Sequence, residues 1–258
     1  MTLPHAANQV SVASFNVAGF EIAKGGSGFS LDDQAALLNR MRPDLVCFQE
    51  MVKDAQGQGA YYPNEDRVAK MAELLSLSYT LYSKPADDDL RFPPLNMRYG
   101  LAILSRWPLA DPVTYQLPQV NDKPGYPRIL LTAVVSPGNG MPPFRIATVH
   151  LMHSPQGQED RVAQAEFINA QFANEPNFFI MGGDYNARSD SEEIRLLLDR
   201  GGWTEAIDSG IDKILYRGSE HWAVLQTRTL PRNGASDHDP IQALFGYSGP
   251  DVKSAKNA

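Results

Sequence analysis

The sequence of 258 residues predicts an α/β protein in which two β-sheets pack face to face and helices cover their outer sides. Two observations predict this class. About ten short β-rich segments are apolar almost throughout, which indicates strands covered on both faces. Four segments with helical spacing are distributed among them, and no low-complexity linker separates them. We therefore expect one domain over residues 1–258, with an ordered core at about residues 9–247 and a polar tail at residues 249–258.

The expected strands recur along the whole chain and are rich in Val, Ile, Leu, Phe and Tyr. They occupy residues 10–17, 44–50, 79–83, 100–105, 128–135, 144–151, 178–183, 212–217, 223–230 and 241–246. The expected helices occupy residues 30–41, 65–76, 158–173 and 191–202. The first begins with Ser30 three residues before Asp33, an arrangement that caps a helix, and the last ends at Gly201, a typical C-terminal cap.

Composition argues against several classes of protein. The formal net charge is −7 and no cluster of Lys and Arg is present, which disfavours tight binding of nucleic-acid phosphates. Cys47 is the single cysteine and has apolar neighbours, so we expect a buried thiol and no intramolecular disulfide. The sequence has neither a signal-peptide pattern nor a run of about 18 apolar residues. We expect a monomeric cytoplasmic protein without a transmembrane segment.

Polar residues that can carry chemistry recur at the ends of the apolar strands. They are Asn16, Glu50, His150, Asp184, Asn186, Asp212 and the group Ser236–Asp239. If the strands that close with such residues run one way and those that open with them run the other way, all of these groups converge on one rim. Carboxylate and amide oxygens are the ligands that hard cations such as Mg²⁺ prefer, and zinc motifs are lacking.

The segment FIMGGDYNA, residues 179–187, has two interpretations. Gly, Asp and Asn are common in turns, so Asp184 and Asn186 alone would indicate a solvated turn. Residues i and i+2 of an extended segment face the same side, so both side chains can also address one ligand while Tyr185 points away.

Seven motifs that follow one another in this order resemble those of the endonuclease/exonuclease/phosphatase superfamily, which has the DNase I-like fold. They are SFNVAG, RPDLVCFQE, YGLAILSRWPL, TVHL followed by DRVAQAEFI, IMGGDYNA, IDKILYR and SDHDPIQALF, and they span residues 10–245. The resemblance implies a four-layered α/β sandwich, in agreement with the strands and helices expected above. With all seven present, the interpretation of Asp184 and Asn186 as part of a site is favoured over the turn.

The resemblance also implies roles for individual residues. Glu50 would be the principal metal ligand, with Asn16 and Asp237 close to the ion. His238 would be the acid/base group, oriented by Asp212.

Five residues would address the substrate. Asp184 and Asn186 would flank the scissile phosphate, where they orient or deprotonate the attacking water and hold an oxygen. Asn16 and His150 would donate to phosphoryl oxygens, and Arg128 falls near an arginine that steadies the rim.

Two departures from the superfamily pattern bear on this site. Ala18 stands where several nucleases have an aspartate, so metal binding should rest more on Glu50. Residues 97–105 offer no obvious carboxylate to pair with His150, and His153 matches nothing in the pattern and is expected to be structural.

These observations predict a Mg²⁺-dependent phosphoesterase, with Mn²⁺ as a possible substitute, that hydrolyses a phosphate ester by in-line attack of water. The expected substrate-facing loops, residues 54–67, 86–100 and 119–128, are poor in Lys and Arg. This favours a phosphorylated small-molecule or lipid-like substrate, whereas a nuclease acting on DNA or RNA is the alternative. A non-catalytic binding module of the same fold is a remoter alternative. Such modules usually lose the residues that bind the metal, whereas here every expected metal and imidazole position is filled.

Overall fold

The structure is a computed structural model that describes residues 6–19, 29–53, 66–85, 99–121, 126–153, 157–218 and 220–249. Most of the three expected substrate loops, namely residues 54–65, 86–98 and 122–125, lies outside the described residues, as does nearly all of the expected C-terminal tail.

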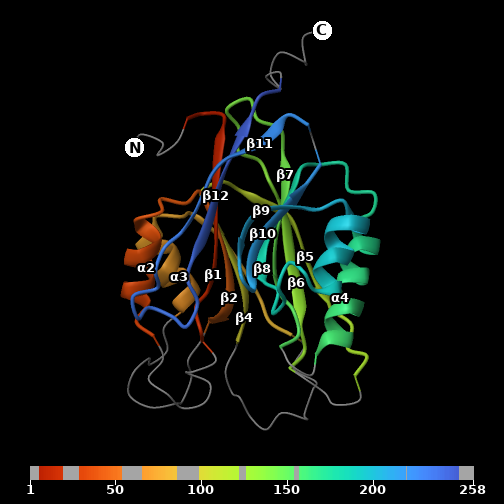
Figure 1. Cartoon of the computed structure of the whole chain (residues 1–258). Coiled ribbons are helices and arrows are strands. Elements are labelled where there is room, and N and C mark those ends of the chain that lie inside the picture. Colours follow the sequence, from red (N-terminus) through yellow and green to blue (C-terminus); the bar gives the residue numbers. More distant parts are fainter. Residues whose placement is uncertain are drawn as a thin grey trace.

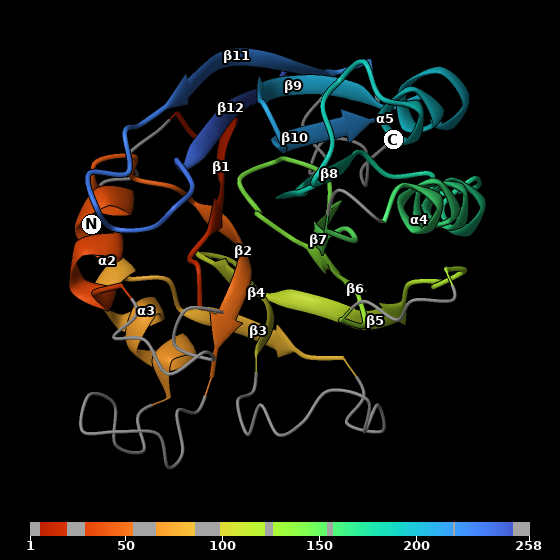
Figure 2. The ribbon, with the colours of Figure 1, turned by 60° about the horizontal axis from the view of Figure 1, so that its bottom comes forward.

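Two six-stranded mixed sheets form the centre of the molecule, and they pack face to face (Figures 1 and 2). The first has the order β11-β12-β1-β2-β4-β3. Its strands are β1 (Gln9–Asn16), β2 (Leu45–Val52), β3 (Tyr79–Ser83), β4 (Tyr99–Ser105), β11 (Trp222–Thr229) and β12 (Ile241–Tyr247). The second has the order β5-β6-β7-β8-β10-β9. Its strands are β5 (Leu109–Gln116), β6 (Ile129–Val135), β7 (Phe144–His150), β8 (Phe179–Asp184), β9 (Thr204–Ser209) and β10 (Asp212–Arg217).

Helices cover the outer face of each sheet, so the molecule has four layers (Figure 2). Helices α2 (Leu31–Asn39) and α3 (Arg67–Leu75) pack on the first sheet. Helix α4 (Gln158–Gln171) and the short helix α5 (Glu192–Arg195), which continues as the π-helical turn η1 (Leu196–Arg200), pack on the second. The α/β sandwich predicted from the sequence is confirmed, and all four expected helices form.

The central strands are apolar on both sides because each sheet packs against the other sheet on one face and against helices on the other. One cluster fills the space between the sheets and two others fill the spaces under the helices. Cys47 is fully buried in the first of these, and burial raises the pKa of its thiol to about 12, so it stays protonated at neutral pH.

The two strands absent from the expected set, β5 and β9, are the two edges of the second sheet. Most of their residues are exposed or half-buried, so their side chains need not be apolar. Pro112 lies in β5 where the register with β6 shifts, as an edge strand permits. Among the helices of the described part of the chain, none is long and apolar enough to cross a membrane.

Candidate active site

Three neighbouring strands of the second sheet bring His150, Asp184 and Asp212 into one row. His150 closes β7 opposite Asp184 at the end of the parallel strand β8. Asp212 opens β10 opposite the same Asp184, because β10 runs antiparallel to β8. The expected convergence of strands that close and open with polar residues is therefore present.

Glycine permits the close approach of the two sheets just below this row. A Cβ atom on Gly182 would lie 3.0 Å from Cβ of Cys47 and 3.1 Å from Cβ of Ser14, both on the first sheet. Strand β8 consequently lies close against β1 and β2, and Asp184 comes within reach of side chains from the other sheet.

Asn16 joins the two sheets at the site. Its Nδ2 donates to Oδ2 of Asp184 at 3.0 Å and lies 3.4 Å from Oε1 of Glu50. Its Oδ1 accepts a hydrogen bond from the backbone N–H of Ala18 at 2.9 Å, which fixes the orientation of the amide. Asn16 thus presents an N–H donor to the carboxylates.

Glu50 stands in a β-bulge. The register of β2 with β4 shifts between Phe48 and Met51, and Glu50 has a positive φ of 57°. A bulge re-aims the side chain of the extra residue. Here it places the Glu50 carboxylate beside Asn16 at the rim, although its neighbours in β2 are buried.

His238 and Asp212 form a short hydrogen bond, with His238 Nδ1 2.7 Å from Asp212 Oδ2. Burial lowers the pKa of His238, but the hydrogen bond to Asp212 and the charges of Asp212, Asp184 and Asp237 outweigh it and raise the pKa to about 9. His238 is therefore an imidazolium at neutral pH. Its Nε2 lies 3.7 Å from Oδ2 of Asp184.

Asp184 is the buried centre of the site. Burial, and then the charge of Asp212, raise its pKa to about 6 despite the opposing effects of His238, Asn186 and Asn16. Its Oδ1 accepts from the backbone N–H of Asn186 at 2.9 Å. A carboxylate whose pKa lies this near neutrality can exchange a proton with water at little cost.

His150 has the opposite electrostatic setting. Burial lowers its pKa well below the ordinary value, and the positive charges of Arg128, His238 and His153 act in the same direction. Its Nε2 lies 3.4 Å from Oδ2 of Asp184, the carboxylate partner that residues 97–105 did not offer. His150 is therefore a neutral imidazole that can donate one N–H.

His153, predicted from the sequence to be structural, contacts Asn186 of the site. Its Nδ1 lies 3.2 Å from Oδ1 of Asn186, whose Nδ2 donates to the carbonyl of Leu151 at 3.1 Å. Because the Asn186 oxygen faces it, the His153 Nδ1 must carry the proton. The sequence could not predict this contact, because strand β7 ends at His150 and the alternation of a strand does not extend to His153.

Two remaining predicted residues lie at the margin. The side chain of Asp237 is 61% exposed, and its Oδ1 lies 3.8 Å from Nε2 of His238. The preceding Ser236 is buried and its Oγ donates to the carbonyl of Asn16 at 2.7 Å, which ties this loop to β1. Arg128 is buried just before β6, near enough to lower the pKa of His150.

Comparison with known proteins identifies the family of the chain. The model of the endonuclease/exonuclease/phosphatase family matches residues 13–238. The chain belongs to the endonuclease/exonuclease/phosphatase family. It is thus a phosphoric ester hydrolase of a family whose members usually depend on a metal ion.

Solved structures show the same fold at low sequence identity. An endonuclease/exonuclease/phosphatase from Beutenbergia cavernae is 20% identical over 95% of this chain and 73% of that chain, with a TM-score of 0.74. The human Nocturnin catalytic domain with bound sulfate is 17% identical, over 93% of this chain and 95% of that one, with a TM-score of 0.70. Truncated TDP2 from Caenorhabditis elegans is 19% identical, over 92% and 97%, with a TM-score of 0.64. No curated protein matches the sequence.

The donor set fits a divalent cation. Ligand atoms of Asp184, Asp212 and His238 lie within 4.8 Å of one another, and Glu50 adds a carboxylate beside Asn16. Burial, and then the charge of Asp212, raise the pKa of Asp184, and a cation nearby would favour its ionised form. The carboxylates of Asp184, Asp212 and Glu50 offer oxygens, the ligand type that hard cations prefer, whereas the His238 Nδ1 is already bonded to Asp212.

Proposed function

We propose that the chain is a Mg²⁺-dependent phosphoesterase that hydrolyses a phosphate ester by in-line attack of water, with Mn²⁺ able to substitute. The observation that carries this proposal is the meeting of a protonated His238 with the buried carboxylate of Asp184 across 3.7 Å. An acid and a base side by side, with donors around them, are what phosphoester hydrolysis requires.

Glu50 would hold the cation, with Asp237 and Asn16 close to it. The imidazolium of His238, bonded through Nδ1 to Asp212, is unsuited to ligation because a metal needs a neutral imidazole. Glu50, with Asn16 and Asp237 nearby, would therefore hold the ion, and His238 would not be one of its ligands. When bound, Mg²⁺ would supply positive charge that stabilises the charge developing on the phosphoryl oxygens.

The proton transfers follow from the two pKa values. Asp184 takes a proton from the attacking water as its oxygen bonds to phosphorus, and His238 gives a proton to the ester oxygen as the P–O bond breaks. Because Asp184 Oδ2 and His238 Nε2 are 3.7 Å apart, the proton can afterwards pass from Asp184 to His238, which restores both groups.

The amide and imidazole donors would hold the phosphate during these steps. Asn16 Nδ2, Asn186 and the N–H of neutral His150 surround Asp184. Arg128 adds a permanent positive charge beside His150. Donors fixed in place before the reaction stabilise the transition state without reorganisation.

We favour a phosphorylated small-molecule or lipid-like substrate. The chain carries a net charge of −7, and residues 54–65 contain no Lys or Arg at all. A long nucleic acid would require a basic track for its phosphates.

A substrate panel tests this proposal. Enzyme with Mg²⁺ or Mn²⁺ is offered sphingomyelin, inositol phosphates, nucleotide phosphates, plasmid DNA and single-stranded RNA. We expect hydrolysis of a small or lipid substrate that EDTA abolishes. Efficient cleavage of plasmid or RNA at low enzyme concentration would establish the nuclease alternative, and no metal-dependent hydrolysis of any ester would contradict the proposal.

A further inference from the structure

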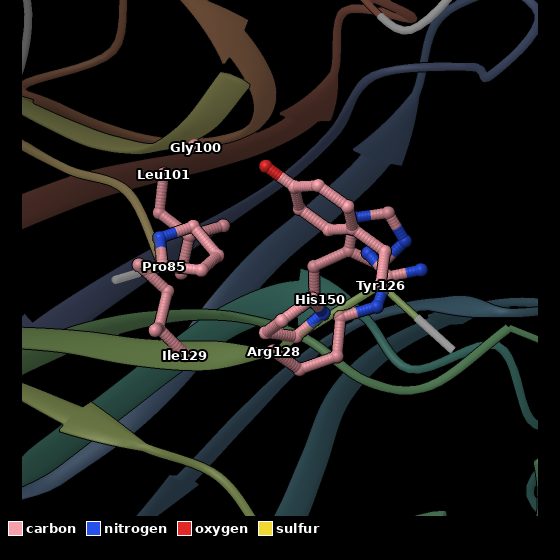
Figure 3. A pocket seen from close by; sticks show the side chains of 8 residues that line it. Pro85, Gly100, Leu101, Tyr126, Arg128, Ile129 and His150 are labelled. Atoms are coloured by element: carbon pink, nitrogen blue, oxygen red, sulfur yellow. The ribbon is translucent and has the colours of Figure 1, made fainter. Parts of the chain in front are cut away.

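A pocket lined by three arginines lies on the outer face of the first sheet, which is the face that the helices cover. It has a volume of about 360 Å³, and its lining includes Arg40 and Arg42, which follow helix α2, together with Arg228 of β11 and Gln242 of β12. The hollow beside His150, shown in Figure 3, has a volume of only about 10 Å³, room for about one water molecule. We call the larger space the arginine pocket.

The arginine pocket and the candidate active site lie on opposite faces of the first sheet. Ser11 lines the pocket and points to the same side as Ala13, which packs under the helices. Asn16 points to the other side, where it bonds to Asp184 of the second sheet. Ser11 and Asn16 are also five positions apart in β1, which is about 16 Å of extended chain. One small ligand therefore cannot occupy both places.

Hydrogen bonds hold the guanidinium of Arg228 in place at the pocket. Its Nε donates to Oε1 of Gln242 at 2.5 Å, and its Nη2 donates to the carbonyls of Arg40 at 3.2 Å and Met41 at 2.7 Å. Its Nη1 is not buried and donates to no acceptor in the described part of the chain. A guanidinium that is already fixed loses little freedom when it binds an anion.

Positive charge collects at the pocket, and none of the residues that line it is acidic. Burial, and then the charge of Arg40, lower the pKa of Arg228, so these two guanidinium groups repel each other. Asp44 accepts from the backbone N–H of Ser11, but it does not line the pocket and is paired with Arg106 at 2.8 Å. An anion in the pocket would offset the repulsion between the arginines.

We propose that the arginine pocket binds a small soluble phosphate anion with at least two charged groups, such as diphosphate. Guanidinium N–H groups match the spacing of phosphate oxygens, and a volume of about 360 Å³ is typical of small-molecule sites. The net charge of −7 opposes the approach of a large anionic surface, such as a membrane or a nucleic acid, more than that of a small ion. None of the proposed reacting groups lines the pocket, so binding of this anion is independent of the proposed function.

Calorimetric titration with diphosphate, in metal-free buffer with EDTA, tests the site without turnover. We expect wild type to bind, and Kd to rise about tenfold or more in Arg228→Gln, because hydrogen bonds to a charged group are lost. Arg40→Gln changes an exposed side chain, so it should keep the fold and raise Kd severalfold. Arg195→Gln, which removes an exposed arginine of α5, is the matched control and should keep the wild-type Kd. No binding by wild type, or an unchanged Kd in Arg40→Gln, would overturn the inference.

Hydrogen exchange measured by mass spectrometry locates the bound anion. Diphosphate should slow amide exchange at residues 40–42 and 226–229 of wild type. Slowing confined to residues 150–153 and 184–188 would place the anion in the reaction centre and contradict the proposal. Sedimentation with vesicles that contain phosphatidic acid is the second arm, and binding to these vesicles without binding to free diphosphate would replace the small ion by a membrane surface. Absent ester hydrolysis is a separate result that bears only on the proposed function.

Discussion

The imidazole of His238 lies among three carboxylates that the chain brings together from β8, β10 and the loop before β12. The hydrogen bond to Asp212 and the surrounding negative charge hold its pKa at about 9. If its proton is used on the leaving oxygen, activity should be retained up to that pH and fall above it, where the imidazole becomes neutral.

Asp212→Asn should lower the pKa of His238, because it removes the charged partner of Nδ1. We predict that the alkaline limb of kcat/KM against pH moves to lower pH in this variant. Asp239→Asn is the matched control, since Asp239 faces Arg232 and is not among the charges that raise the His238 pKa. An alkaline limb at the same pH in Asp212→Asn and wild type would argue against His238 as the acid.

His153 offers a second prediction for a single residue. His153→Ala removes the donor to Asn186 Oδ1, so the amide is less well fixed and kcat should fall by about two- to tenfold, the value of one hydrogen bond. His153→Gln, which can restore a donor, should recover part of the loss. Because His153 is exposed, the melting temperature should not change. An unchanged kcat would make His153 merely structural.

Among the secondary-structure elements, a hydrogen bond between Gln49 of β2 and Thr148 of β7 helps to set the geometry of the site. Gln49 is fully buried, and its Nε2 donates to Thr148 Oγ1 at 2.9 Å and to Ser14 Oγ at 3.2 Å. The bond to Thr148 crosses from the first sheet to the second next to Glu50 and His150, whereas the bond to Ser14 joins β2 to β1 within the first sheet. They help to hold the two halves of the site in register.

Gln49→Ala should destabilise the protein by about 2 kcal/mol, because it removes the hydrogen bonds of Gln49 to the buried hydroxyl groups of Ser14 and Thr148. We also predict a lower kcat, since Glu50 and His150 lose a shared support. Urea unfolding and steady-state kinetics measure the two effects. The exposed Gln226→Ala of β11 is the control and should change neither. Wild-type kcat in Gln49→Ala, despite lost stability, would show that the link does not position the site.

Some of the strands and site residues could be predicted from the sequence and others could not. Strands that are buried on both faces need apolar side chains on both sides, and this pattern is visible in the sequence. Ten strands and the polar residues at their ends could therefore be predicted. The edge strands β5 and β9 could not, because solvent on one side removes the apolar requirement. The bulge at Glu50 and the contact of His153 with Asn186 were also unpredictable, since both depend on local backbone geometry that composition does not encode.

For the whole molecule, the two sheets act as rigid supports that present groups distant in sequence to one point. Asn16 and Asp184 are 168 residues apart and hydrogen-bond at 3.0 Å. The glycine at position 182 and the short inter-sheet contacts make this meeting possible. The proposed reaction therefore requires the intact sandwich, because both sheets contribute groups to the site.

The most direct measurement is Mg²⁺-dependent hydrolysis of an aryl phosphodiester by wild type, Glu50→Ala and His238→Ala, with His221→Ala as the histidine control. Glu50 comes from the first sheet, and His238 is bonded to Asp212 of the second. We predict that both variants keep the wild-type fold by circular dichroism and lose nearly all turnover, while His221→Ala and wild type remain active and EDTA abolishes their activity. Wild-type-like rates in either Glu50→Ala or His238→Ala would contradict the proposed site.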